Sequence, residues 1–229
     1  MRVLGIVPAR GGSRRVESKN LRKLGERTLV QRAIDAALES KSLARVVVSS
    51  DTPEVLRAAR ESGCLALHRP PQLCTDRSLA WEYVEHALTS ISEEAFDAFC
   101  IVQPSSPFTR ADDIDNCARL LNEMGTRSVA SVVKVDHFVH PRKLKRLDGG
   151  MLRAAFAEEK GRMAEHELEV VHARNGSVYL SRVEVLEEKR VIDENDCCGY
   201  EMPRERSVDI NDEMDLAFAQ LLLERGWVT

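Results

Sequence analysis

The residues best suited to chemistry lie in the loop 8–20, which follows directly after the apolar run 3–7. The loop contains the adjacent glycines Gly11 and Gly12, and its positive charges are Arg10, Arg14, Arg15 and Lys19. Adjacent glycines let successive backbone N–H groups turn toward an anion, and nearby cations neutralise it. The pattern predicts a site for the phosphate chain of a nucleotide, although it has neither the motif G-x-x-x-x-G-K-[ST] nor the motif G-x-G-x-x-G. The alternative interpretation is a solvated turn with basic neighbours.

The residues that follow the other predicted strands point to the same kind of ligand. In an open parallel sheet, ligands bind beyond the carboxyl ends of the strands. The positions there are rich in amide, hydroxyl and cationic groups and poor in carboxylates: 49–51, Arg69, 103–107, 173–179, Asp209 and Asn211. Such groups suit a polyphosphate, a base edge and a polyol better than a hydride or an acyl group. No dedicated general base is evident among them.

The elements that position these residues alternate regularly through the first 135 residues. Apolar runs predict strands at 3–7, 45–50, 64–67, 99–103 and 128–135. Helical periodicity predicts helices at 28–38, 53–62, 78–91 and 111–124, and later at 211–225. Segments 177–180 and 207–210 are predicted to return to the main sheet. This alternation predicts an α/β fold with a largely parallel sheet flanked by helices.

The alternation breaks between residues 137 and 174. Charge is dense there, Asp148-Gly149-Gly150 is typical of a hairpin turn, and 168–172 is expected to be an exposed strand. We therefore divide the chain into an α/β domain of residues 1–136 and 175–229, which is expected to bind a nucleotide and a polyol such as a sugar, and an inserted region of residues 137–174. The insertion has little apolar sequence for a core of its own, so it is expected to pack on a second subunit and form a homodimer.

Composition excludes several classes of protein. The chain has 229 residues and a formal net charge of −4, which argues against nucleic acid as a partner. No apolar run approaches the roughly 18 residues that a membrane span needs. The first strand begins at once, so no signal peptide is expected. Six scattered cysteines are expected to be reduced thiols, which favours a cytoplasmic protein.

Several motifs together resemble those of the acylneuraminate cytidylyltransferases, the CMP-sialic acid synthetases, from residue 1 to about 225. They stand in the family's order: Pro8-Ala9-Arg10-Gly11-Gly12-Ser13, Lys19-Asn20, Arg69-Pro70, Gln103-Pro104-Ser105-Ser106-Pro107, Arg174-Asn175-Gly176-Ser177-Val178-Tyr179 and Ser207-Val208-Asp209-Ile210. The resemblance implies a fold like that of the nucleotide-diphospho-sugar transferases, with a small inserted dimerisation domain. It also implies that CTP and a nonulosonic acid react to give a CMP-sugar and pyrophosphate, with Mg²⁺ as the cofactor.

The resemblance implies a role for individual residues. The nucleotide-binding set is Ala9, Arg10, Gly11, Gly12, Ser13, Lys19, Asn20, Arg69 and Ser78. The acidic sugar is assigned to Gln103, Asn175 and Tyr179, and the metal to Asp209 and Asn211. Arg10, Lys19 and Asp209 are the candidate catalytic residues.

Two departures from the family pattern leave the sugar open. Position 211 is Asn where the family usually has a second Asp, so Asn211 is a weaker metal ligand or, like Asp212, a helix cap. The stretch Arg-Gln-x-Leu-Pro is replaced by Met163-Ala164-Glu165-His166-Glu167-Leu168. Alternatives are a legionaminic, pseudaminic or deoxyoctulosonic acid as substrate, GTP in place of CTP, or a nucleotide-binding regulatory module without turnover.

Overall fold

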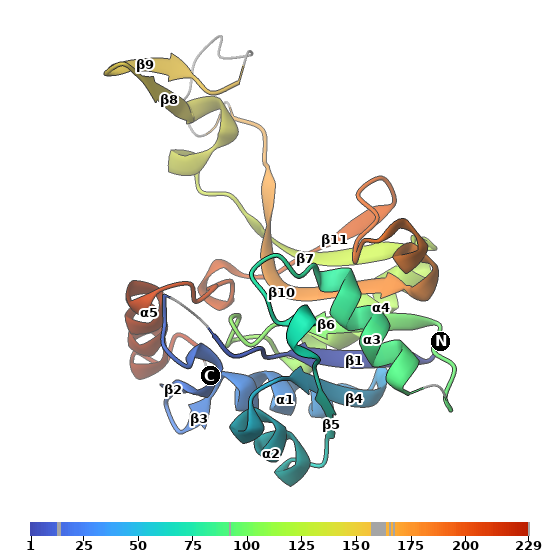
Figure 1. Ribbon diagram of the computed structural model, residues 1–229. Coiled ribbons are helices and arrows are strands. Elements are labelled where there is room, and N and C mark those ends of the chain that lie inside the picture. The colour runs from blue at the N-terminus through green and yellow to red at the C-terminus, as the bar shows by residue number, and fades with distance from the viewer. Residues whose placement is uncertain (13–14, 92, 157–163, 165, 167, 229) are drawn as a thin grey trace.

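A seven-stranded sheet forms the centre of the molecule, in the order β11-β7-β10-β6-β1-β4-β5 (Figure 1). The computed structural model describes residues 1–228 except 13–14, 92, 157–163, 165 and 167. The strands are β1 (Val3–Pro8), β4 (Leu43–Ser50), β5 (Leu65–His68), β6 (Ala98–Val102), β7 (Ser128–Lys134), β10 (His172–Arg182) and β11 (Cys197–Glu201). Neighbouring strands are parallel except where β10 pairs with β6 and β7. The predicted largely parallel α/β sheet is confirmed.

Helices cover both faces of this sheet. One face packs against α1 (Leu29–Glu39), α2 (Pro53–Glu61) and α4 (Ala111–Met124), and the other against α3 (Ala80–Ser90). Alternation along β1 explains the two cores, because Val3 and Val7 belong to the first cluster and Leu4 and Ile6 to the second. A strand buried on both faces needs a continuous apolar run, which is the pattern that the sequence has at this position.

The residues that the sequence predicts at helix ends begin α1 and terminate α4. Thr28 caps the start of α1 in a capping box with Gln31, and Gly125 ends α4 in the left-handed conformation with φ of 66°.

All six cysteines are free thiols: Cys64, Cys74, Cys100, Cys117, Cys197 and Cys198. In the part of the chain that the structure describes, no helix is long and apolar enough to cross a membrane.

A third apolar cluster packs α5 (Glu213–Glu224) beside the small hairpin of β2 (Lys23–Leu24) and β3 (Arg27–Thr28). Segment 207–210 joins this cluster and forms no strand, contrary to the prediction. Val208 and Ile210 are buried and Asp209 is exposed, so the in-out alternation of a strand is present. Among the described residues, the segment nevertheless pairs with no strand, and a backbone bond from Ile210 N to Ser105 O at 2.8 Å links it to the 103–107 loop.

The residue that caps α5 is Asp212. Its carboxylate accepts from the N–H of Asp215 at 3.0 Å. Asn211 precedes the cap, and its own backbone N–H donates to Asp215 at 2.7 Å. The interpretation of Asn211 as a helix cap is therefore wrong, and its side chain is left to face the site described below.

A slender arm projects from the sheet between the end of β7 and the start of β10 (Figure 1). It contains two 3₁₀ turns, His137–Val139 and Pro141–Lys143, and a hairpin of β8 (Lys145–Asp148) and β9 (Met151–Ala154). Gly149 and Gly150 have positive φ at the predicted turn. The expected strand at 168–172 is wrong, because 168–171 forms no strand and β10 begins at His172.

Candidate functional site

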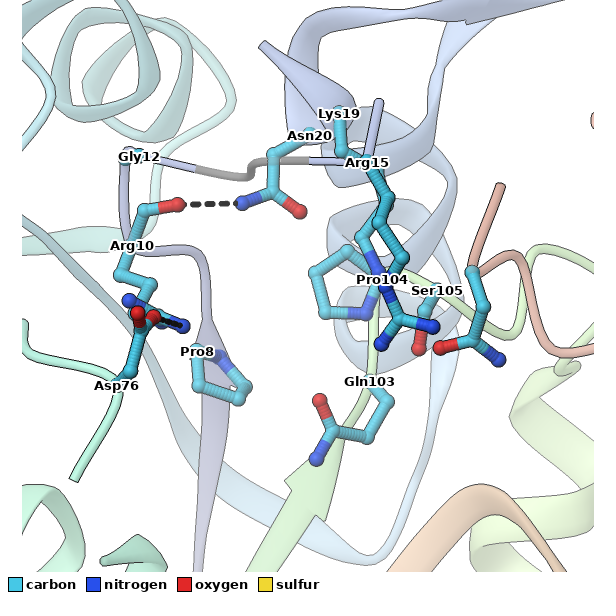
Figure 2. Close-up of a pocket in the computed structure, with 12 residues that line it drawn as sticks. Pro8, Arg10, Gly12, Arg15, Lys19, Asn20, Asp76, Gln103, Pro104 and Ser105 are labelled. Carbon is cyan, nitrogen blue, oxygen red and sulfur yellow. Dashed lines mark hydrogen bonds and ion pairs between the residues drawn. The ribbon is translucent and has the colours of Figure 1, made fainter. Parts of the chain in front are cut away.

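A cavity of about 410 Å³ opens beyond the carboxyl ends of β1 and β6. Figure 2 shows Arg10 and Asp76 on one side of it, Arg15 and Lys19 across from them, and Gln103 at the end of β6. The lining residues are Pro8, Arg10, Gly11, Gly12, Arg15, Lys19, Asn20, Asp76, Gln103, Pro104, Ser105 and Asn211. The structure therefore brings together residues from three separate motifs of the sequence, at the edge of the sheet where they were expected.

Hydrogen bonds to neighbouring protein groups hold the glycine loop in place. Gly11 N donates to Asp51 Oδ1 at 2.6 Å, and Asn20 Nδ2 donates to Arg10 O at 2.9 Å. Ala9 is fully buried, and its carbonyl accepts from Ser50 Oγ at 2.6 Å. These bonds fix the path of the backbone before any ligand arrives.

Asp51 supports the glycine loop, a role that the sequence analysis did not assign to it. Burial opposes its charge, but hydrogen bonds from the N–H groups of Gly11 and of Asp51 itself keep the pKa of the carboxyl below its usual value. Gly11 is needed for this contact, because a Cβ there would lie 2.9 Å from Thr52 Oγ1 and 3.4 Å from Asp51 Oδ1. The only sequence signal was the position of Asp51 directly after a strand.

The cations of the cavity are positioned by bonds to the walls. Arg10 donates to Cys74 O and to Asp76 Oδ1, both at 2.9 Å. Lys19 Nζ donates to Ile210 O at 2.8 Å. The pKa of Lys19 is lowered, first by burial and then by Arg15 and Arg10, while Asp209 opposes the shift. A partly dehydrated ammonium among other cations favours the binding of an anion such as a phosphate.

The opposite wall carries the candidate metal ligands. Asn211 lines the cavity, and its Nδ2 donates to Asp209 Oδ2 at 2.8 Å. Among the described residues, no three His, Cys, Asp or Glu side chains gather as a metal site. One exposed carboxylate with a neighbouring amide does fit Mg²⁺, which keeps most of its waters and binds substrate phosphates.

Three predicted nucleotide-binding residues that the structure describes do not line the cavity: the buried Ala9, Arg69 and Ser78. Arg69 is 2% exposed, donates to Ser49 Oγ and Ser49 O at 3.0 Å, and lies 4.4 Å from the ring centroid of Tyr83. Ser78 Oγ donates to Gln72 O at 3.0 Å and closes a turn. Ser13 lies outside the described residues. Contacts of these four residues with a nucleotide stay predictions.

The sugar-binding candidates are divided between the cavity and its surroundings. Gln103 lines the cavity, whereas Asn175 and Tyr179 do not. Tyr179 packs on the α3 side of the sheet, and burial raises the pKa of its hydroxyl. Asn175 is 6% exposed and bonded within the protein. Arg15, Asp76, Pro104 and Ser105 line the cavity although the site prediction did not include them.

The sheet and its cationic edge cavity have the form of a nucleotide-binding α/β domain. The family model described as "Cytidylyltransferase" matches residues 4–193, so the chain belongs to the cytidylyltransferase family. It is 27% identical over 219 residues to N-acylneuraminate cytidylyltransferase of Escherichia coli O18:K1:H7, covering 95% of this chain and 51% of that protein. The chain thus spans about half the length of this relative.

Two further comparisons cover whole chains. CMP-N,N'-diacetyllegionaminic acid synthase of Legionella pneumophila is 27% identical over 230 residues, which are 98% of this chain and 97% of that protein. The solved structure of CMP:2-keto-3-deoxy-manno-octonic acid synthetase complexed with CTP superposes with a TM-score of 0.72 at 16% identity. It covers 99% of this chain and 100% of that one. This structural likeness shows a shared fold.

We predict that Lys19→Ala weakens the binding of a nucleoside triphosphate far more than it lowers thermal stability. Loss of a charged hydrogen bond to phosphate should reduce affinity about ten- to a hundredfold. Loss of the bond to Ile210 O should lower the melting temperature by only about 2–4 °C. Calorimetric titration and thermal melting measure the two effects.

Lys23→Ala is the matched control, because Lys23 is an exposed lysine of β2.

The charge of Lys19 is lost as pH rises through its lowered pKa, so the affinity of the wild-type protein for a nucleoside triphosphate should fall at alkaline pH. Lys19→Arg should keep its affinity to higher pH. Near-normal binding by Lys19→Ala with a large drop in melting temperature would show that Lys19 is structural.

Proposed function

We propose that the protein transfers a CMP group from CTP to an acidic nonulosonic sugar and releases pyrophosphate. The observation that carries the proposal is one cavity lined by the glycine loop, Lys19 and Asn211 in a chain of the cytidylyltransferase family. Asp209 does not line the cavity itself but accepts a hydrogen bond from Asn211 at its wall. Relatives named for acylneuraminic, diacetyllegionaminic and pseudaminic acids support the class of sugar. The structural neighbour complexed with CTP supports the nucleotide.

In this reaction a sugar hydroxyl oxygen forms a bond to the α-phosphorus of CTP. The bond from that phosphorus to the β-bridging oxygen breaks, pyrophosphate leaves, and the hydroxyl proton passes to solvent. Charge therefore grows on the phosphoryl oxygens and on the leaving group, where fixed cations are most effective. Arg10, Arg15 and Lys19 supply these charges from the cavity wall.

The metal requirement is part of the proposal. Mg²⁺ bound to phosphates neutralises charge on the leaving pyrophosphate. Asp209 would hold the ion with its carboxylate, and Asn211 would offer a neutral amide oxygen in place of a second charge. We infer that this site depends on CTP itself for metal binding more than a site with two aspartates does.

The direct test is incubation with CTP, Mg²⁺ and a panel of nonulosonic acids, followed by mass spectrometry for a CMP-sugar. The panel includes sialic, legionaminic, pseudaminic and deoxyoctulosonic acids, and each is repeated with GTP. We expect CMP-sugar and an equal amount of pyrophosphate with at least one acid. Binding of CTP without pyrophosphate release on any acid would instead favour a regulatory module.

We predict that Asp209→Asn abolishes activity, whereas Asn211→Asp keeps it and lowers the Mg²⁺ concentration needed for half-maximal rate. The physical reason is that Mg²⁺ prefers charged oxygen ligands. Titration of Mg²⁺ at saturating CTP measures both effects. If Asp209→Asn keeps a normal rate and metal requirement, the metal lies elsewhere.

We also propose that the arm 137–174 forms a homodimer. Its apolar side chains have little cover, with Phe138 78%, Leu147 74% and Leu152 71% exposed. All residues of β8 and β9 are exposed. Large exposed apolar groups on a projecting element are typical of a protein–protein contact.

We also propose that the protein is located in the cytoplasm, where reducing conditions keep cysteines such as these six as free thiols.

Light scattering at micromolar concentration should report a dimer, and Leu152→Glu should convert it into a folded monomer because Leu152 supports no core. Met124→Glu, at a 60% exposed methionine at the end of α4, is the control and should stay dimeric. A wild-type monomer with intact activity would rule out this role for the arm.

A further inference from the structure

The segment that carries Asp209 has no place in the sheet, so something other than a strand ladder must fix it. Its backbone bonds to the cavity side are Ile210 N to Ser105 O and Lys19 Nζ to Ile210 O. Both lie after Asp209 in the chain. On the other side of Asp209, Met202 N donates to Val132 O of β7 at 2.8 Å, and the backbone bonds of 203–207 are local. Between Met202 and Asp209, side chains therefore make the hydrogen bonds that tie the described segment to the rest of the domain.

Asn175 is the first of these side chains. Its Nδ2 donates to Ser207 Oγ at 2.9 Å and lies 3.3 Å from Met202 Sδ. Its Oδ1 accepts from Ser131 Oγ at 2.6 Å and from Ser177 N at 3.2 Å. An amide has two N–H donors and two acceptor lone pairs, so its capacity is used within the protein. At 6% exposure, Asn175 offers little to a sugar.

The bulge that contains Asn175 lies directly against Asp209. Between Arg174 and Tyr179 the register of β10 shifts relative to β7, and Gly176 there has a φ of 81°. A Cβ at Gly176 would lie 3.4 Å from Ser106 Oγ and 4.0 Å from Asp209 Cγ. The bulge thus presents a bare backbone to the carboxylate while Asn175 bonds to the segment before it.

Arg206 is the second side chain. It forms a bidentate ion pair with Asp113, in which Nη2 donates to Oδ1 at 2.9 Å, and Nη1 also contacts Phe108 O at 3.4 Å. Asp113 also accepts from Tyr200 Oη at 3.1 Å. The side chains of Arg206 and Asp113 are only 13% and 2% exposed, so the pair is little screened by solvent. The hydrogen bond to Asp113 raises the pKa of Arg206, which stays charged.

We propose that Asn175 and Arg206 are positioning residues for Asp209. The Asn175–Ser207 hydrogen bond and the Arg206–Asp113 ion pair, together called the Asp209 clamp, hold the segment so that its carboxylate faces Lys19 and the metal on CTP. This inference rests on the proposed function. It replaces the sugar contact that the family resemblance implies for Asn175 with a role in metal and nucleotide binding.

The test is a double-mutant cycle of Asn175→Ala and Ser207→Ala. Mg²⁺ affinity of the CTP complex is measured by calorimetry without sugar, and the KM for sugar is measured separately. Each single variant should weaken Mg²⁺ binding about fivefold, the effect of one typical hydrogen bond. The double variant should be no weaker than the poorer single one, because both remove the same bond. The KM for sugar should change less than about twofold if neither side chain touches the sugar.

Two further variants separate positioning from plain stability. Ser207→Thr keeps the hydroxyl and should restore Mg²⁺ affinity. Ser40→Ala removes a buried hydroxyl that donates to Asp115 at 2.6 Å far from the cavity, so it should lower the melting temperature with Mg²⁺ affinity unchanged. Arg206→Lys keeps the charge without the bidentate geometry and should also weaken Mg²⁺ binding.

The clamp is overturned if Asn175→Ala raises the KM for sugar while Ser207→Ala leaves both measurements normal. It is equally overturned if both variants lose melting temperature only, as Ser40→Ala should. A wild-type protein that binds no CTP rejects the proposed function itself. Normal wild-type binding and turnover with unchanged variants rejects only the clamp.

Discussion

The hydrogen bond from Gly11 N to the Asp51 carboxylate is the contact on which the cavity depends. It pulls the loop after β1 against the end of β4, so that the side chains of Arg10 and Lys19 are left to face the opening. A glycine is required because a side chain at position 11 would collide with Thr52. The loop is thus shaped by an internal anion, and the external anion meets cations whose positions are already set.

The two walls of the cavity come from distant parts of the chain, and Lys19 joins them. Its ammonium donates to Ile210 O, on the segment that carries Asp209. Burial and neighbouring cations lower its pKa, while Asp209 opposes them. The same lysine therefore lies between the negative charge of Asp209 and the positive charges of the glycine loop. A ligand that brings both phosphates and a cation satisfies both walls at once.

Much of the fold could be predicted from the sequence, because buried parallel strands need continuous apolar runs and helices need caps such as Thr28 and Gly125. The site edge followed from the rule for open sheets. The contacts of single side chains could not be predicted. Segment 207–210 has the alternation of a strand, but pairing requires a partner that the pattern does not name. The family resemblance assigned Asn175 to the sugar, and the sequence does not show that its amide is bonded within the protein, to partners that include the distant Ser131 and Ser207.

A crystal structure with CTP and Mg²⁺ tests the central claim that both walls are formed before the ligand binds. The account predicts phosphates between Arg10 and Lys19, the metal at Asp209, and the backbone of 9–12 and 207–211 superposing on the structure described above. Density for the triphosphate outside this cavity, or a loop that has released Asp51 to bind it, would contradict the account.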